Sequence, residues 1–195
     1  MSSRRDEIIE LAKQLFAERG VQETSMRDLA EVAGILPSSL YSHFKSKEAL
    51  ADEILHDFLR ALVDEFRAVE ATSDNALERL RALLRVTIRA IETDPAALSI
   101  YRRDYQYLVS LPRFAYLYEL HIEIRTIWLA AIEVAMAEGY LRNDVDPVVF
   151  YRWVRDALTF TPRWHRAGEQ PTVDQLTTFA ERVFLDGMAL KPRGD

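Results

Sequence analysis

The spacing of acidic and histidine side chains gives a first test for catalytic chemistry. Glu53 and His56 have the Glu-x-x-His spacing with which helices of di-iron bundles present a ligand pair. Such a site needs a second copy, and the sequence contains none. Glu119, His121 and Glu123 place two carboxylates four residues apart, but the histidine falls on another side of the helix. The pattern predicts a solvated polar stripe and no metal site.

Other enzyme chemistries lack their characteristic residues. The chain has no cysteine, which excludes a thiolate nucleophile, a zinc-thiolate site and a disulfide framework. Its six glycines are scattered and form no phosphate-binding cluster, and no serine lies in a nucleophile elbow. We therefore expect a protein that is not an enzyme and has no cofactor.

A different chemistry is indicated around residues 37–47, where small hydrogen-bonding, aromatic and basic side chains gather. On a helix beginning at Pro37, Leu40 and Phe44 share a buried face at i, i+4 spacing. The exposed side then carries Ser38, Tyr41, Ser42 and Lys45, with Ser39 and His43 at its margins. No carboxylate occurs from residue 34 to residue 47, so this face is locally positive and suits a polyanion such as DNA.

The overall charge must be weighed against this interpretation. The net charge is −6, and residues 1–50 sum to −1, with seven Lys or Arg against eight Asp or Glu. Binding to a polyanion depends on where the charges lie rather than on their sum.

Helical periodicity places this face in a helix-turn-helix. A first helix has its buried face at Ile8, Leu11, Ala12, Leu15 and Phe16 and ends at Gly20. Ser25 with Asp28 predicts a capping box at the start of a second helix, and Gly34 ends it. The tight turn to Pro37 completes the motif.

The rest of the chain also reads as helices. Ser46 caps a long fourth helix, and later helices start after residues 73–75, at Asp94-Pro95 and at Leu111-Pro112. The last two are predicted at about residues 148–165 and 172–189. The fold class is therefore all-α, with about nine helices and no strand. Residues 1–46 form the helix-turn-helix DNA-binding domain, and residues 47–195 form the ligand-binding and dimerisation domain.

The stretch TSMRDLAEVAGILPSSLYSHFKSKEAL resembles the DNA-binding segment of the TetR family of bacterial repressors, and the likeness extends over residues 7–55. The resemblance implies that Tyr41, His43 and Lys47 approach backbone phosphates, as do Thr24, Ser25 and Arg27 at the second helix. Base edges would be met by Ser38, Ser39 and Tyr41. Because serine discriminates bases weakly, the operator sequence stays open. Tyr41 could instead pack on the fourth helix, and His43 could support the turn.

Residues from about 75 onward resemble the ligand domain of TetR-type repressors of steroid-ring degradation in actinobacteria, which respond to coenzyme A thioesters. The likeness rests on NALERLRALL, IYRRDYQYLVSLPRF, EGYLRNDVDPVVFYRWVRD and PRWHRAGEQPTVDQL. The region is rich in aromatic residues, which could line a pocket or fill a core. The predicted ligand-binding residues are Tyr101, Tyr105, Trp128, Tyr151, Arg155, Phe160 and Trp164.

Arginines among apolar neighbours bear on that pocket. Arg102, Arg103, Arg152 and Arg155 would be costly to bury without a partner. Asp104 and Asp156 are adjacent acids, so internal ion pairing is one interpretation and an anionic ligand is the other. Arg155 is the preferred ligand residue because its helix is the most aromatic.

The last predicted helix is apolar over most of its length, and a single chain cannot easily bury all of this apolar surface. A symmetric four-helix interface in a homodimer would cover it. The predicted interface residues are Leu176, Phe179, Ala180, Val183, Phe184 and Gly187.

Together these features predict a cytoplasmic, ligand-responsive repressor that binds a palindromic double-stranded DNA operator as a dimer. A small hydrophobic effector, such as an acyl or steroid-derived coenzyme A thioester, would release it. No apolar run reaches the roughly 18 residues of a membrane span, so no membrane association is expected. A helical scaffold that shares only the helix-turn-helix shape is the alternative.

Overall fold

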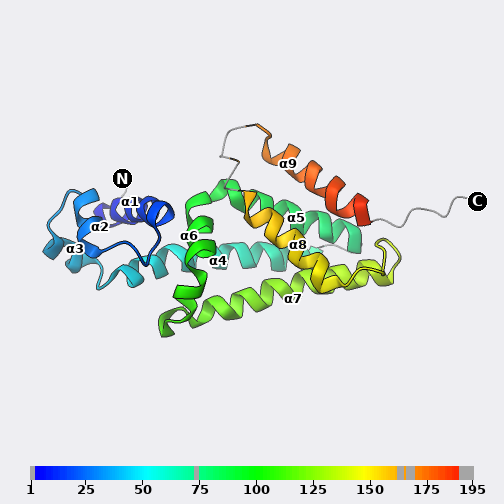
Figure 1. The fold of residues 1–195 in the computed structure, drawn as a ribbon, viewed down its shortest axis with the longest axis horizontal. Coiled ribbons are helices and arrows are strands. Elements are labelled where there is room, and N and C mark those ends of the chain that lie inside the picture. Colours follow the sequence, from blue (N-terminus) through cyan, green and yellow to red (C-terminus); the bar gives the residue numbers. More distant parts are fainter. Residues whose placement is uncertain (1–2, 73–74, 162–164, 166–169, 189–195) are drawn as a thin grey trace, which may run out of the picture. The chain divides into compact units, whose positions relative to one another are not determined.

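The structure, a computed structural model, describes residues 3–72, 75–161, 165 and 170–188 (Figure 1). These residues form helices and connecting turns, and no β-strand occurs among them. The all-α prediction is confirmed. The chain divides into two compact units, which are described separately.

The first unit comprises the chain up to Ala61 together with Asp94–Glu119. Its elements are α1 (Arg4–Arg19), α2 (Met26–Val32), α3 (Pro37–His43), the first part of α4 (Lys47–Thr72), α6 (Pro95–Val109), η1 (Pro112–Phe114) and the start of α7 (Ala115–Ala137). Helix α6 packs against α1. The core of the helix-turn-helix is apolar, with Phe16, Val21 and Leu40 fully buried.

Local signals determine where the first helices begin and end. The Ser25 hydroxyl accepts a hydrogen bond from the Asp28 N–H, and the Asp28 side chain accepts one from the Ser25 N–H, which is the predicted capping box. Gly20 ends α1 with φ at 97°, and Gly34 follows α2 with φ at 63°. Both angles lie in the left-handed region that glycine adopts at little cost. The predicted helices α1, α2 and α3 are therefore confirmed, except that Leu11, predicted on the buried face of α1, is 37% exposed.

The second unit comprises Leu62–Thr93 and the chain from Leu120 onward. It contains the rest of α4 and α7, together with α5 (Ala76–Thr93), α8 (Pro147–Thr159), α9 (Val173–Ala180) and the π-helical turn η3 (Glu181–Asp186). Its core includes Leu80, Leu84, Ile132, Phe150 and Val154. Helix α9 runs along α5 (Figure 1).

The last helices differ from the predicted bounds. Helix α8 ends at Thr159 instead of continuing to residue 165. The final helix starts at the predicted place, where Thr172 caps it, but it changes to π-helical geometry at Glu181. The compact units also group residues 94–119 with the helix-turn-helix, and the functional boundary after residue 46 stays a prediction. None of the described helices is long and apolar enough to cross a membrane.

Candidate nucleic-acid interface and ligand-binding region

The outer face of α3 is available to a partner. Leu40 and Phe44 are buried at 0% and 3% exposure, as their spacing predicts. The exposed side chains on and beside this helix are Ser38, Ser39, Tyr41, Ser42, His43 and Lys45. Tyr41 is 55% exposed, so its ring is not packed away on α4. We call these six residues the recognition face.

Residues around the start of α2 lie differently from one another. Arg27 is exposed, whereas the Ser25 hydroxyl accepts the Asp28 N–H and donates to the Asp28 carboxylate in the cap. Thr24 is only 1% exposed, and its hydroxyl donates to the Gly20 carbonyl at 2.6 Å. The Thr24 side chain, predicted to contact a phosphate, is thus buried and hydrogen-bonded within the α1–α2 turn. In this conformation Thr24 has a structural role.

A buried carboxylate holds the turn between α1 and α2. Asp104, on α6, accepts the Val21 N–H at 3.1 Å and is also bonded by the Gln22 N–H. On the same turn, the half-buried Lys47 donates to the Gln22 carbonyl at 2.7 Å. Burial raises the pKa of Asp104, against the lowering effect of these N–H groups. Asp104 of α6 and Lys47 of α4 are thus both hydrogen-bonded to the α1–α2 turn.

Arg103 also bonds α6 to the end of α1, and it does not form a bonded ion pair with its neighbour Asp104. Its guanidinium donates to the Glu18 carbonyl at 2.7 Å, near the end of α1. Further along α6, the Tyr107 hydroxyl donates to the Glu48 carboxylate at 3.0 Å. Helix α6 is therefore bonded to the end of α1, the α1–α2 turn and the start of α4.

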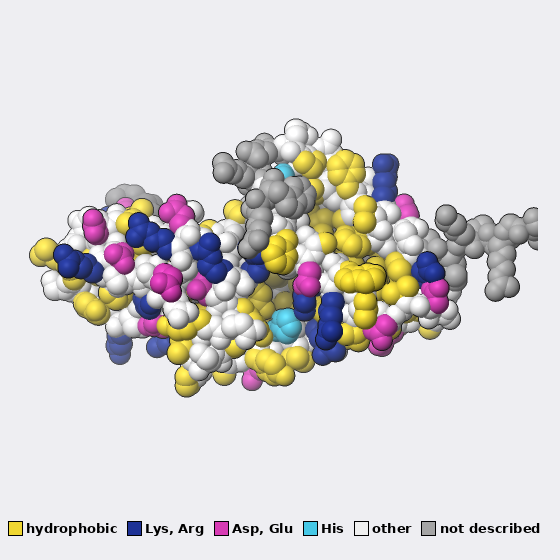
Figure 2. All heavy atoms as spheres, in the orientation of Figure 1, with side chains coloured by type: hydrophobic (Ala, Val, Ile, Leu, Met, Phe, Trp, Pro, Cys, Tyr) yellow, Lys and Arg dark blue, Asp and Glu magenta, His cyan; other side chains and the backbone are white. Residues whose placement is uncertain are grey.

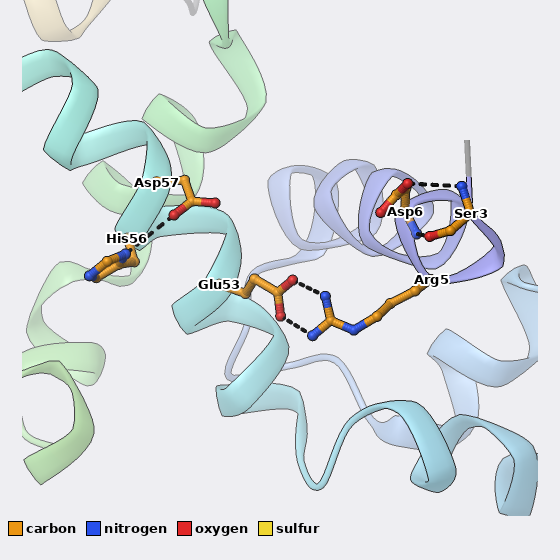
Figure 3. Close-up of polar contacts among 6 residues, drawn as sticks. All are labelled: Ser3, Arg5, Asp6, Glu53, His56 and Asp57. Atoms are coloured by element: carbon orange, nitrogen blue, oxygen red, sulfur yellow. Dashed lines mark hydrogen bonds and ion pairs between the residues drawn. The ribbon is translucent and has the colours of Figure 1, made fainter. Parts of the chain in front are cut away.

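Glu53 and His56, which have the spacing of a di-iron ligand pair, contact different partners in the structure. Figure 3 shows Glu53 facing Arg5 of α1 in a two-pronged ion pair, while His56 lies on another side of α4 beside Asp57. The Arg5 guanidinium also stacks 4.7 Å from the centre of the Phe44 ring. Among the described residues, no group of three or more His, Cys, Asp or Glu could hold a metal ion.

These residues border an open hollow of about 460 Å³ beside the end of α3. Its charged walls are largely paired, since Arg5 bonds Glu53 and Arg113 lies 3.1 Å from Asp52. The hollow is therefore a neutralised surface rather than a strong anion or cation site.

The predicted ligand residues separate into two groups. In the second unit, Trp128 and Tyr151 are buried with ring centres 6.3 Å apart, and the Arg155 guanidinium lies 5.7 Å from the Tyr151 ring. Tyr101 and Tyr105 belong to the first unit, where their rings meet edge to face at 5.5 Å. Phe160 is 43% exposed at the end of α8, and Trp164 lies outside the described residues.

The ion pair anticipated for Arg155 is present. Its Nε donates to the Asp156 carboxylate at 2.8 Å. Two basic residues that the sequence analysis did not select lie near it, His121 and Arg125 of α7. The four-residue spacing of His121 and Arg125 was the available signal, but their position facing α8 depends on tertiary packing.

The predicted dimer residues also differ in placement. Leu176 and Ala180 are buried in the core of their own protomer. Phe184 is half-buried against that core, while Gly187 is exposed. Phe179 and Val183 are 48% and 66% exposed, and Trp153 of α8 is 63% exposed. Figure 2 shows exposed hydrophobic side chains over α8 and α9 of this unit.

Comparisons with known proteins agree with this architecture. Residues 8–54 match the bacterial regulatory proteins of the tetR family, and residues 73–188 match the tetracyclin repressor-like C-terminal domain. The transcriptional repressor KstR2 of Rhodococcus jostii is 39% identical over 96% of this chain and 92% of its own length. KstR2 of Mycobacterium tuberculosis is 41% identical over 96% of this chain and 94% of its own.

A solved structure has the same fold. The ketosteroid transcriptional regulator KstR2 of M. tuberculosis superposes with a TM-score of 0.91 at 39% identity, covering 98% of this chain and 97% of that one. The helix-turn-helix with its exposed recognition face and the match to these regulators together place the chain in the class of DNA-binding transcriptional regulators, whose members here are not enzymes. The chain belongs to the TetR family and is a ligand-responsive repressor of that family.

Proposed function

We propose that the protein binds a palindromic operator as a homodimer through the recognition face, and that a coenzyme A thioester of a steroid-derived or other apolar acid releases it. The exposed, carboxylate-free surface of α3 is the observation that carries the DNA-binding part. Lys45 and Lys47 supply positive charge beside it, and Ser38, Ser39 and Tyr41 supply groups for base edges. Such a repressor would act on DNA in the cytoplasm.

The proposed effector class has two sources of support. The similar solved structure of M. tuberculosis KstR2 is named as a ketosteroid transcriptional regulator, which favours an effector built on a bulky apolar skeleton. In this chain, Arg155 lies beside the buried pair Trp128 and Tyr151, so one region offers both an aromatic wall and a cation. An acyl group and an anionic carrier would match these two features.

The proposed interface between protomers uses Phe179 and Val183, with Leu176 and Ala180 supporting their helix from inside. Two recognition faces joined in this way would meet half-sites about 34–36 Å apart, or a multiple of that distance. The operator would then be an inverted repeat.

Operator binding can be tested with inverted repeats selected from random duplexes by the full-length protein. Fluorescence anisotropy over a salt series should give a steep linear loss of log affinity, and Lys47→Ala should flatten the slope by about one unit. Arg142→Ala is the matched control, since Arg142 is an exposed arginine paired with Asp144 in the second unit. A wild-type protein that selects no inverted repeat, or whose affinity ignores salt, would favour the scaffold alternative.

A further inference from the structure

Helix α3, which carries most of the recognition face, is short and makes few packing contacts of its own. Among its seven residues, all of which the structure describes, only Leu40 is buried. The residue before it, Leu36, has no side-chain oxygen that could cap the first turn. Because a helix of this length is not stable alone, its orientation depends on contacts made by the residues that flank it.

Two successive arginines at the start of α1 contact the chain on either side of α3. The Arg4 guanidinium donates to the Ala33 carbonyl at 2.5 Å, at the end of α2. The Arg5 guanidinium lies 4.7 Å from the centre of the ring of Phe44, the residue that directly follows α3. Both flanks of α3 are therefore attached to the first turn of α1.

Arg5 is itself bonded to Glu53 of α4. Figure 3 shows the Arg5 side chain extending from α1 toward α4, where two guanidinium nitrogens meet the two Glu53 carboxylate oxygens. The side chains are 45% and 30% exposed, so this pair adds little to the free energy of unfolding. A planar guanidinium bonded at two nitrogens is nevertheless fixed in direction, and its stacking fixes the Phe44 ring relative to α1 and α4.

The charge of Glu53 would by itself oppose DNA binding. Glu53 borders the hollow beside α3 together with His43 and Lys45 of the recognition face. A carboxylate close to a DNA-binding surface repels the phosphate backbone unless a cation neutralises it. If Glu53 favours DNA binding, it must therefore act through the side chain that it holds and not through its own charge.

We propose that Arg4, Arg5 and Glu53 are positioning residues that set the orientation of α3 for the operator without touching DNA. We call these three residues the α1 brace. Phe44 lies between His43 and Lys45 in the sequence, so a shift of Phe44 moves two members of the recognition face. The inference deepens the proposed function and rests on it, because it assigns residues that determine how well the recognition face fits an operator.

Operator affinity of the full-length protein tests the α1 brace. The probes are the inverted repeat that the wild-type protein selects and a scrambled duplex of the same length, with fluorescence anisotropy over a salt series as the measurement. Glu53→Gln should weaken binding to the repeat about threefold although it removes a negative charge, and should not weaken binding to the scrambled duplex. Arg5→Met should weaken binding to the repeat about fivefold with an unchanged salt slope, and Arg4→Met should act in the same direction.

Further variants separate positioning from a loss of stability. Because Arg5 and Glu53 act as one unit, Arg5→Met combined with Glu53→Gln should bind the repeat no more weakly than Arg5→Met alone. Arg5→Lys keeps the charge without the planar fork and should recover only part of the affinity. Arg142→Met, which breaks a two-pronged ion pair with Asp144 in the second unit, is the matched control and should bind like wild type.

Thermal unfolding should show that each variant is folded at the temperature of the binding assay. Glu53→Gln keeps the size of its side chain and carries the test if Arg5→Met fails to fold. If Glu53→Gln strengthens binding to the repeat, or if Arg5→Met flattens the salt slope by about one unit, Arg5 contacts a phosphate directly and the α1 brace is wrong.

Failure of the α1 brace and failure of the proposed function give different results. Equal affinity of wild type and all brace variants for the repeat would overturn the brace and leave the operator-binding repressor standing. If the wild-type protein prefers no inverted repeat over the scrambled duplex, the proposed operator binding fails, and the brace fails with it.

Discussion

In the first unit, the charged residues bordering the hollow beside α3 are largely paired, whereas in the second unit the guanidiniums of Arg125 and Arg155 lie near one ion-paired acid, the exposed Asp156. Arg5 with Glu53 and Arg113 with Asp52 illustrate the first arrangement. An ion pair fixes a side-chain geometry, whereas a cation whose partner acid is exposed can still bind an anionic ligand. We therefore expect the first unit to present a preformed surface to DNA and the second unit to bind the effector.

The largest expected effect comes from the surface that would join protomers. Phe179→Glu combined with Val183→Glu should give monomers, because charge would be buried in an apolar seam. Loss of the second recognition face should lower operator affinity by roughly 10²-fold or more. Light scattering and anisotropy measure both effects, and Thr178→Glu on the same helix is the control. A compact dimer in the double variant would place the interface elsewhere.

A smaller effect on stability and operator affinity is expected from the bond between Asp104 and the α1–α2 turn, which we call the tether. Asp104→Leu leaves the Val21 N–H without its acceptor, which should lower the free energy of unfolding by about 1–3 kcal/mol. Because the α1–α2 turn also holds Lys47, operator affinity should fall about tenfold. Asp104→Asn keeps one acceptor oxygen and should recover most of that affinity. Equal affinity for wild type and the leucine variant would show that the tether does not position the DNA-binding helices.

Features that depend on neighbouring residues could be predicted from the sequence, whereas contacts between distant parts of the chain could not. The capping of α2 by Ser25 and Asp28 and the exposed face of α3 depend on residues within one or two helical turns, so spacing alone locates them. The bond from Val21 to Asp104 joins residues 83 positions apart, and no local pattern indicates it. Likewise, periodicity assigns Leu176 and Phe179 to one apolar helix but does not show that α5 covers only the first of them.

The pH dependence of stability should separate Asp104 from an ordinary surface acid. Its pKa is raised by burial, so the folded protein holds this proton more tightly than the unfolded chain does. The resulting stabilisation is fully present below the unfolded pKa of about 3.9 and is lost as pH rises through the higher folded pKa. Denaturant unfolding of wild type and Asp104→Asn across this range should show a wild-type decline that the asparagine variant lacks. Parallel curves would contradict the assigned role of burial.

The smallest expected change concerns one hydroxyl on the recognition face. Tyr41→Phe keeps the ring and the fold but removes a hydrogen-bonding group from an exposed position. Affinity should fall only about two- to fivefold, a net hydrogen bond of about 0.5–1 kcal/mol, with altered preference among operator sequences. Competition between selected duplexes measures this, and an unchanged preference would assign Tyr41 a packing role.

The central claim, that the first unit holds DNA while the second unit controls its release, is tested most directly by titrating thioesters into a labelled operator complex. Arg155→Met should bind operator like wild type but need at least about tenfold more thioester for release, equivalent to about 1.4 kcal/mol of lost differential affinity. Arg152→Met should behave like wild type in both respects. Anisotropy curves that coincide for all three proteins would contradict the assignment of release to this part of the second unit.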